Sequence, residues 1–388
     1  MKKHVLFFVA FAFILTSCVK DGAKVEYFYY PEDDYKMMSQ YIDIPAYPES
    51  YTLDFPSYYT RANVRSFDNG MAVLGRVLFY DKNLSSDRTI SCASCHDQQI
   101  GFSDDVAFSQ GVSNRATSRN SLPLGSTFNF AEYYGNPLFG SIPFFWDNRA
   151  FNVAEQSKQT LGNPLEMDMH MSEVVERVKS LEYYKPMFDK EFGQINENSI
   201  LAAISEFVNS IGSFETKFDK ALEAHFQSYG NLENLEGKKF VGFNDSENRG
   251  KDIYMAKCAS CHSSDFGAPS KVQANNGLKM VYEDEGIYDI SSVSTDKGHF
   301  KIPTLRNITL TAPYMHDGSL ATLSDVIDHY SSGIQGHAYL SPELISNSGQ
   351  PVQMNFSNQD KQDLIAFLTT LEDEVLKTDK KFSDPFIK

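Results

Sequence analysis

The sequence has few cysteines, and none is left over for a disulfide. Five occur among the 388 residues, and four of these belong to two copies of one short motif. Only Cys18 remains, so the chain has no further pair for a structural disulfide. It also lacks a basic excess, because 35 Lys and Arg face 51 Asp and Glu and give a net charge of -16. This balance argues against nucleic acid as a partner and against a basic membrane-binding patch.

Long apolar runs are missing as well. Lys2, Lys3 and His4 precede the apolar residues 5–15, a run too short to span a bilayer comfortably. A basic start, a short apolar stretch and small residues before a cysteine are typical of an export signal. Because Leu15-Thr16-Ser17-Cys18 resembles a bacterial lipobox, we expect a lipoprotein signal over 1–18 and acylation of Cys18. An ordinary signal peptide with an incidental cysteine is the alternative. Either form predicts export. The lipoprotein form predicts a periplasm-facing protein that contacts a bacterial cell membrane through its lipid anchor only.

The repeated motif reads Cys92-Ala93-Ser94-Cys95-His96 and Cys258-Ala259-Ser260-Cys261-His262. C-x-x-C-H is the attachment sequence of c-type haem, in which two thiols add to the porphyrin vinyl groups and the histidine binds iron. Zinc would need four ligands grouped in one site, and a redox C-x-x-C needs no following histidine. The sequence therefore predicts two covalent haems, held by Cys92, Cys95, Cys258 and Cys261, with iron ligands His96 and His262.

Apolar residues recur at helical spacing through much of the chain, and no region is rich in strand patterns. We expect a mainly α fold with two cytochrome c-like domains, each binding one haem. In each domain a helix leads into the motif and an irregular segment follows, which indicates a weak internal duplication. The expected division is a signal over 1–18, a tether and N-terminal extension over 19–60, a first haem domain over 61–235 and a second over 236–388.

The chemistry of a haem depends on its two axial positions. A haem with both positions filled transfers electrons, whereas an open position furnished with polar groups allows peroxide chemistry. No histidine lies between His96 and His170, the stretch that should form most of the first pocket. We therefore expect an open first iron, with Glu166 as a candidate acid–base group over it. A solvated surface role for Glu166 is the alternative. His225 lies on an apolar helical face, so a core or edge position is expected for it.

Several further stretches carry a family resemblance. They are Phe145-Trp146-Asp147-Asn148-Arg149-Ala150, Gln156, and the ranges 163–167, 300–307 and 311–318. From about residue 68 to residue 371 the chain resembles the bacterial di-haem cytochrome c peroxidases and the related MauG enzymes. The resemblance implies a peroxidatic haem in the first domain and an electron-relay haem in the second. It places Gln156 and Glu166 over the peroxidatic iron, and Trp146, the only tryptophan, between the haems. It also implies a calcium ion held by the Asn120 side chain and the carbonyls of Thr311 and Pro313.

Two departures from the peroxidases bear on the mechanism. Peroxidases that need reductive activation carry a histidine upstream of Arg119-Asn120, and residues 110–118 contain none. This predicts a first haem that is five-coordinate in the oxidised state. The second departure is Tyr330, which stands where the peroxidases have the methionine ligand of the relay haem and where MauG-type enzymes have a tyrosine. His329, Met315 and Met354 are alternative ligands, and a core tyrosine beside an open haem is a further one.

The predicted function is a cytochrome-c peroxidase. It would reduce hydrogen peroxide to water with electrons from a small cytochrome c or a similar periplasmic donor. The first alternative is a MauG-like enzyme that oxidises a protein or organic substrate, which the tyrosine at position 330 favours. A non-catalytic electron carrier or redox sensor is the second. A homodimer is one assembly that the sequence allows.

Overall fold

The computed structural model describes residues 29–59, 66–127 and 142–388. The predicted signal and the acylated Cys18 lie outside these residues. No helix within the described ranges is long and apolar enough to cross a membrane.

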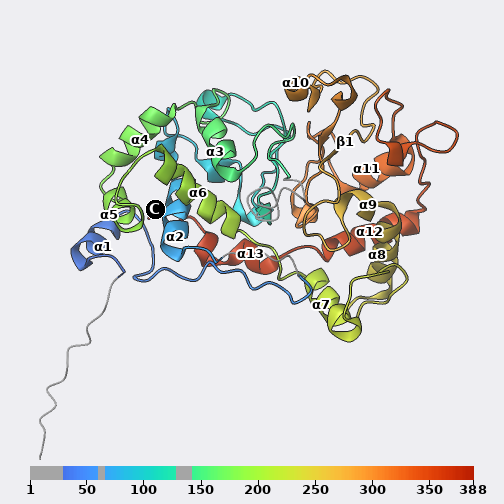
Figure 1. Ribbon diagram of the computed structural model, residues 1–388, viewed down its shortest axis with the longest axis horizontal. Helices are drawn as coiled ribbons and strands as arrows, with labels where there is room; N and C mark the ends of the chain where they lie inside the picture. Colours follow the sequence, from blue (N-terminus) through green and yellow to red (C-terminus); the bar gives the residue numbers. More distant parts are fainter. Residues whose placement is uncertain (1–28, 60–65, 128–141) are drawn as a thin grey trace, which may run out of the picture.

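The described chain is built mainly from helices in two lobes, with α1 to α6 in one lobe and α7 to α12 in the other (Figure 1). This confirms the predicted mainly α class. The α-helices are α1 Glu32–Met38, α2 Asn69–Tyr80, α3 Val153–Gly162, α4 Met171–Ser180, α5 Tyr184–Glu191, α6 Glu197–Ser210, α7 Lys217–Tyr229, α8 Asp245–Lys257, α9 Ala259–His262, α10 Tyr288–Ser291, α11 Leu323–Asp328, α12 Asn358–Thr369 and α13 Glu374–Thr378.

Short elements connect these helices. Two strands, β1 Gln273–Ala274 and β2 Phe300–Lys301, pair antiparallel with Gln273 opposite Lys301. The π-helix η8 spans His329–Gly333. The 3-10 helices are η1 Lys82–Leu84, η2 Cys92–Ser94, η3 Gln98–Ile100, η4 Val112–Asn114, η6 Ser294–Asp296, η7 Ile308–Leu310, η9 Pro342–Leu344 and η10 Lys380–Phe382.

The two lobes repeat one helix crossing. In the first, α2 meets α6 at Gly75, where an added Cβ would lie 1.9 Å from the Ala203 carbonyl oxygen. In the second, α8 meets α12 at Gly250, where an added Cβ would lie 1.9 Å from the Asp363 carbonyl oxygen. In both lobes the glycine lies on the helix that leads to the haem motif. A glycine allows the two helix backbones to approach closely. The shared crossing agrees with two domains of one plan.

The hydrophobic cores cross the predicted segment boundaries. The sequence predicts that residues 19–60 form a tether with surface structure. In the described residues 29–59, however, Tyr30, Met38 and Tyr51 are buried in the first core. The C-terminal tail also returns to this core through Leu376 and Phe382, although the predicted division assigned it to the second domain. The C-terminus accordingly lies in the first lobe (Figure 1). These segments are short and rich in aromatic residues, so they lack the repeated helical spacing of apolar residues by which a core helix is recognised.

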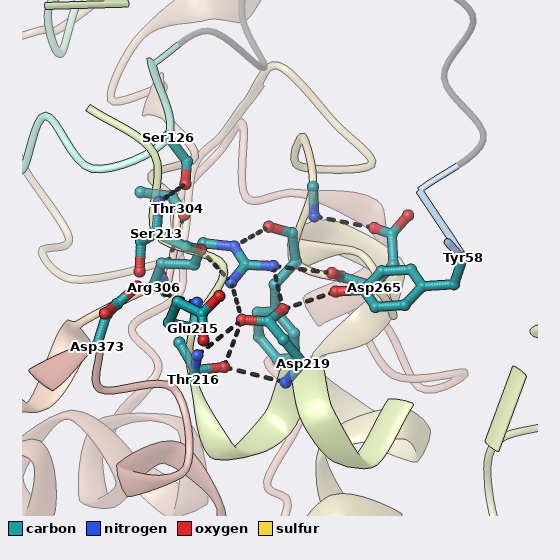
Figure 2. A network of polar contacts seen from close by, with 12 residues as sticks. Tyr58, Ser126, Ser213, Glu215, Thr216, Asp219, Asp265, Thr304, Arg306 and Asp373 are labelled. Carbon is teal, nitrogen blue, oxygen red and sulfur yellow. Dashed lines mark hydrogen bonds and ion pairs between the residues drawn. The ribbon is translucent and has the colours of Figure 1, made fainter. Parts of the chain in front are cut away.

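A buried ion pair lies in the second lobe at the start of α7 (Figure 2). Arg306 binds Asp219 through two hydrogen bonds of 2.9 Å, and Tyr58 donates to the same carboxylate at 2.6 Å. Arg306 also donates to the carbonyls of Ser213 at 2.6 Å and Phe266 at 2.8 Å. The cluster therefore ties the N-terminal extension and the link between α6 and α7 to the second lobe.

Candidate haem sites

The first haem motif forms η2 and the turn after it. Ser91 caps this turn, since its N–H donates to Ser94 Oγ at 3.0 Å. The chain then reverses through Gly101 and Phe102, both in the left-handed region with φ of 63° and 60°. This reversal brings the Phe102 carbonyl to 2.9 Å from His96 Nδ1. With Nδ1 held by a carbonyl, Nε2 is the nitrogen that remains for iron.

The first motif lines a cavity of about 180 Å³. Neither Cys92 nor Cys95 is in a disulfide. Burial raises the pKa of Cys92 to about 12 and that of Cys95 to about 11, so both thiols are neutral. Burial also lowers the pKa of His96 to about 4, which leaves the imidazole in the neutral form that binds metals. Thioether bonds to a haem would replace the ionisable thiols by neutral groups, which a buried position favours.

The second motif lies at the end of α8 and in α9, beside a cavity of about 210 Å³. His262 Nδ1 is 3.2 Å from the Pro303 carbonyl, and burial lowers the pKa of His262 to about 4. Burial raises the pKa of Cys258 to about 12, and Cys258 and Cys261 are not in a disulfide. At both sites the unpaired buried thiols and the oriented neutral imidazole fit a covalently attached haem.

Glu166 and Gln156 line the first cavity together with His96. Asn163 Nδ2 donates to Glu166 Oε1 at 2.6 Å, and Gln156 Nε2 donates to Thr160 Oγ1 at 3.1 Å. Burial raises the pKa of Glu166 above its ordinary value, while hydrogen bonds from Thr160 and Asn163 oppose the rise. Among the described residues that line this cavity, His96 is the only histidine. The cavity thus holds a carboxyl and an amide, and no second imidazole from the described chain.

Trp146 lies in the wall of both cavities. Its Nε1 donates to the Asn120 carbonyl at 2.9 Å, and its own carbonyl accepts from the Lys301 N–H at 2.8 Å. The indole is therefore held in place between the two motifs.

Two residues at this junction were not singled out from the sequence as site residues. His316 lines the second cavity, stacks on Phe300 with ring centroids 3.7 Å apart, and lies 6.5 Å from the Trp146 ring. Lys301 lines both cavities and donates to the Pro143 carbonyl at 2.6 Å, and burial lowers the pKa of Lys301 to about 7. The only sequence signal for either residue is its place in the stretches 311–318 and 300–307.

The residues expected to hold calcium are found at the second cavity. Asn120, Thr311 and Pro313 all line it. The Asn120 N–H donates to the His316 carbonyl at 2.8 Å, which ties the Asn120 segment to the segment 311–318. Asn120 Nδ2 donates to the Val106 carbonyl at 3.0 Å. The structure thus places the three residues in the lining of one cavity, and the calcium site stays a prediction.

The second cavity is lined by several side chains of the types that bind haem iron. Tyr330, Met315 and Met354 line it, whereas His329 does not. His329 Nε2 instead lies 3.1 Å from the Asn276 carbonyl. Burial raises the pKa of Tyr330 to about 12. Tyr330 belongs to η8, and π-helical turns frequently occur at functional sites.

His225 lies far from this chemistry in the second core. It is buried and packs on Tyr229 and Phe240, with ring centroids 4.6 Å and 5.4 Å away. This is the core position that its apolar helical face predicts.

Comparisons with known proteins agree with this geometry. The family model described as di-haem cytochrome c peroxidase matches residues 69–227, and that described as cytochrome c matches residues 247–372. The chain is 32% identical to a methylamine utilization protein MauG of Methylorubrum extorquens, over 78% of each chain. It is 31% identical to a cytochrome c551 peroxidase of Nitrosomonas europaea, over 78% of this chain and 79% of that one.

A solved structure is similar over most of its length. It is a MauG-like protein associated with microbial copper homeostasis, 31% identical in sequence. The match has a TM-score of 0.72 and covers 86% of this chain and 98% of that one. Two haem motifs in two cores of one plan, and relatives that align across both, show that the chain belongs to the di-haem cytochrome c peroxidase and MauG family.

Proposed function

We propose that the protein reduces hydrogen peroxide to water at the first haem and receives electrons through the second. The observation that carries this proposal is the position of Trp146 in the walls of both cavities. One cavity offers an acid–base carboxyl and no second histidine from the described chain, and the other offers further side chains that would bind a haem iron held by His262. This is the division of labour that a peroxidase with a separate electron entry needs.

The proton chemistry belongs to Glu166. When bound at His96, haem supplies the electron transfer that cleaves the oxygen–oxygen bond. The Glu166 carboxylate takes a proton from one peroxide oxygen and returns it to the other, which leaves as water. Asn163 holds this carboxyl at 2.6 Å, so its direction is set before peroxide enters. Gln156 lines the same cavity and orients the peroxide oxygens through its amide.

The electron chemistry runs between the cavities. Each peroxide takes up two electrons and two protons to give two waters. We assign the entry of these electrons to the second haem and their passage to Trp146. The donor is a small cytochrome c or a similar periplasmic protein, and the net charge of -16 suits a basic one. This assignment requires export, and we further propose Cys18 as the lipid-bearing residue.

Calcium is part of the proposed site. Asn120, Thr311 and Pro313 offer one amide and two backbone carbonyls, which are oxygen ligands that calcium accepts. Because they come from both domains, a bound ion would fix the spacing between the cavities. Calcium removal should therefore slow electron transfer between the haems.

A second candidate function is favoured by Tyr330. A phenol oxygen stabilises ferric iron, so a second haem with this ligand would accept electrons from a cytochrome less readily. Such a protein would oxidise a protein or organic substrate instead, in the manner of MauG. The two functions share the first haem and differ in how fast the second is reduced.

Peroxide mixing tests these functions on the haem-loaded protein. Rapid oxidation of reduced cytochrome c, in step with peroxide consumption, is the expected result. A peroxide-induced spectral change that persists beside unreacted reduced cytochrome would favour substrate oxidation instead. No spectral change with peroxide would contradict both enzymatic functions and leave an electron carrier or sensor.

A further inference from the structure

Asn276 contacts three of the side chains that can compete for the second iron. Its Nδ2 lies 3.4 Å from Met315 Sδ and 3.5 Å from the Tyr330 hydroxyl oxygen. Its backbone carbonyl lies 3.1 Å from His329 Nε2. One residue thus touches the tyrosine, one of the two methionines and the neighbouring histidine.

The direction of the Asn276 amide is set by its own turn. The Leu278 N–H donates to Asn276 Oδ1 at 3.1 Å, so the oxygen of the amide is occupied. An asparagine oxygen that accepts from the backbone two residues on is an Asx turn. The NH₂ group must then point the other way, toward Met315 and Tyr330.

The backbone around Asn276 is also fixed. Asn275 is fully buried and its N–H donates to Ser341 Oγ at 3.0 Å. Gly277 has a φ of 67°, and an added Cβ would lie 2.7 Å from the Gln335 carbonyl oxygen. Asn276 is therefore held from both sides.

All three contacts favour Tyr330 over Met315 and His329 as the ligand of the second haem. An N–H donor at the Tyr330 oxygen stabilises the negative charge that this oxygen carries as an iron ligand. The N–H donor at Met315 holds the thioether beside the amide, so Met315 would give up this hydrogen bond if its side chain turned toward the iron. A carbonyl at His329 Nε2 holds that imidazole away from the cavity. The choice matters because a thioether raises the reduction potential of haem, whereas a phenolate stabilises ferric iron.

We propose that Asn276 is a positioning residue that selects Tyr330 as the sixth ligand of the second haem and holds Met315 and His329 away. This inference rests on the proposed function, because it takes the second cavity as a haem site with Tyr330 as its ligand. It goes further in naming the residue that decides between a tyrosine-ligated and a methionine-ligated relay.

The test compares Asn276→Leu with the wild type, both haem-loaded, by ferric absorption, electron-spin resonance and redox titration. Leucine keeps the volume and removes the donor. We expect the sulfur–iron charge-transfer signature of methionine ligation to appear and the potential of the second haem to rise. Adding Met315→Leu to the same protein should abolish the new signature. Adding Met354→Leu to Asn276→Leu is the matched control, since Met354 lines the same cavity, and the new signature should persist in that protein.

Two single variants keep the inference testable if Asn276→Leu does not fold. Met315→Leu alone should leave the ferric spectrum unchanged, and Tyr330→Phe alone should change it. The inference is overturned if Met315→Leu changes the spectrum, if Tyr330→Phe does not, or if Asn276→Leu keeps the ligation and potential of the wild type. The peroxide reaction of the wild type reports on the proposed function independently, because it depends on the first haem.

Discussion

Arg306 and Asp219 form a bidentate ion pair at the junction of the two haem domains, and both side chains are almost fully buried, with 0% and 2% exposed (Figure 2). Replacing Arg306 by Met leaves a buried carboxylate without its partner. Breaking a buried pair in this way costs about 3–5 kcal/mol. We expect a loss of that size in the free energy of unfolding, measured with denaturant on the haem-loaded protein.

A surface pair supplies the control for this prediction. Lys239 and Asp245 are 81% and 79% exposed, so Lys239→Met should cost less than about 1 kcal/mol. Equal losses for Arg306→Met and Lys239→Met would show that the buried pair does not hold the junction.

Gly250→Ala should destabilise the second domain. The new Cβ would lie 1.9 Å from the Asp363 carbonyl oxygen, so α8 must move away from α12. Overpacking of this kind costs about 1–3 kcal/mol. The control is Gly162→Ala at the end of α3, where an added Cβ meets nothing within 4 Å. Thermal unfolding should show a lower midpoint temperature for Gly250→Ala, whereas the midpoint of Gly162→Ala should equal that of the wild type. Similar midpoints for the two variants would contradict the close crossing of α8 and α12.

Asp363 links the stability of the second domain to pH. Hydrogen bonds from Arg249 lower the pKa of Asp363 to about 2 in the folded state, against an ordinary value of about 3.9. A carboxyl with a depressed folded pKa stabilises the fold above its unfolded pKa, and this stabilisation is lost as pH falls from about 4 toward 2.

The corresponding variant is Asp363→Asn. It should cost about 1 kcal/mol at pH 7, below the roughly 1.5–3 kcal/mol of a hydrogen bond to a charged group, because Arg249 is half-exposed. It should also flatten the fall in stability between pH 4 and pH 2. Denaturant titrations across this range measure both effects, and an acid slope equal to that of the wild type would remove Asp363 as its source.

The haem motifs and the helices before them could be predicted because their signals are local. The Asp68 cap of α2 is such a case, since its carboxylate accepts from the Met71 N–H at 3.0 Å, three residues on. Burial of Phe218 and Leu222 in α7 could be predicted from their spacing, but their packing in the second core could not. A helical stripe shows that a face is buried without showing which core covers it.

The same limit applies to the site. Asn276 could not be found from the sequence, because its contacts join the turn after β1 to the chain near residues 315 and 330. No periodic pattern links these positions. The resemblance to the family placed Trp146 between the haems, but the stacked pair of His316 and Phe300 beside it emerges only from the fold.

Glu166→Gln should slow peroxide reduction by about 10²–10⁴-fold, the usual contribution of a positioned acid–base group. Burial raises the pKa of Glu166, and the carboxylate is the form that accepts the proton. The rate in the wild type should therefore fall as pH drops below this raised pKa, and the rate in the variant should lack that dependence. Glu176→Gln on α4 is the control, since Glu176 is 74% exposed and pairs only with Lys179 in the described chain. A wild-type rate and pH profile in Glu166→Gln would exclude the acid–base role.

Trp146→Phe should separate the two haems kinetically. Phenylalanine keeps an aromatic ring in the shared wall but is harder to oxidise than indole, and it loses the hydrogen bond to the Asn120 carbonyl. We expect slower transfer of electrons from the second haem to the first after peroxide addition, with the ferric spectra of both haems unchanged. Stopped-flow absorption at the haem bands measures this rate. Phe151→Leu, at an aromatic side chain that is 59% exposed, should leave the rate unaltered. If Trp146→Phe transfers electrons as fast as the wild type, the electrons take a route that does not depend on the indole. The position of Trp146 in both cavity walls would then no longer support the proposed function.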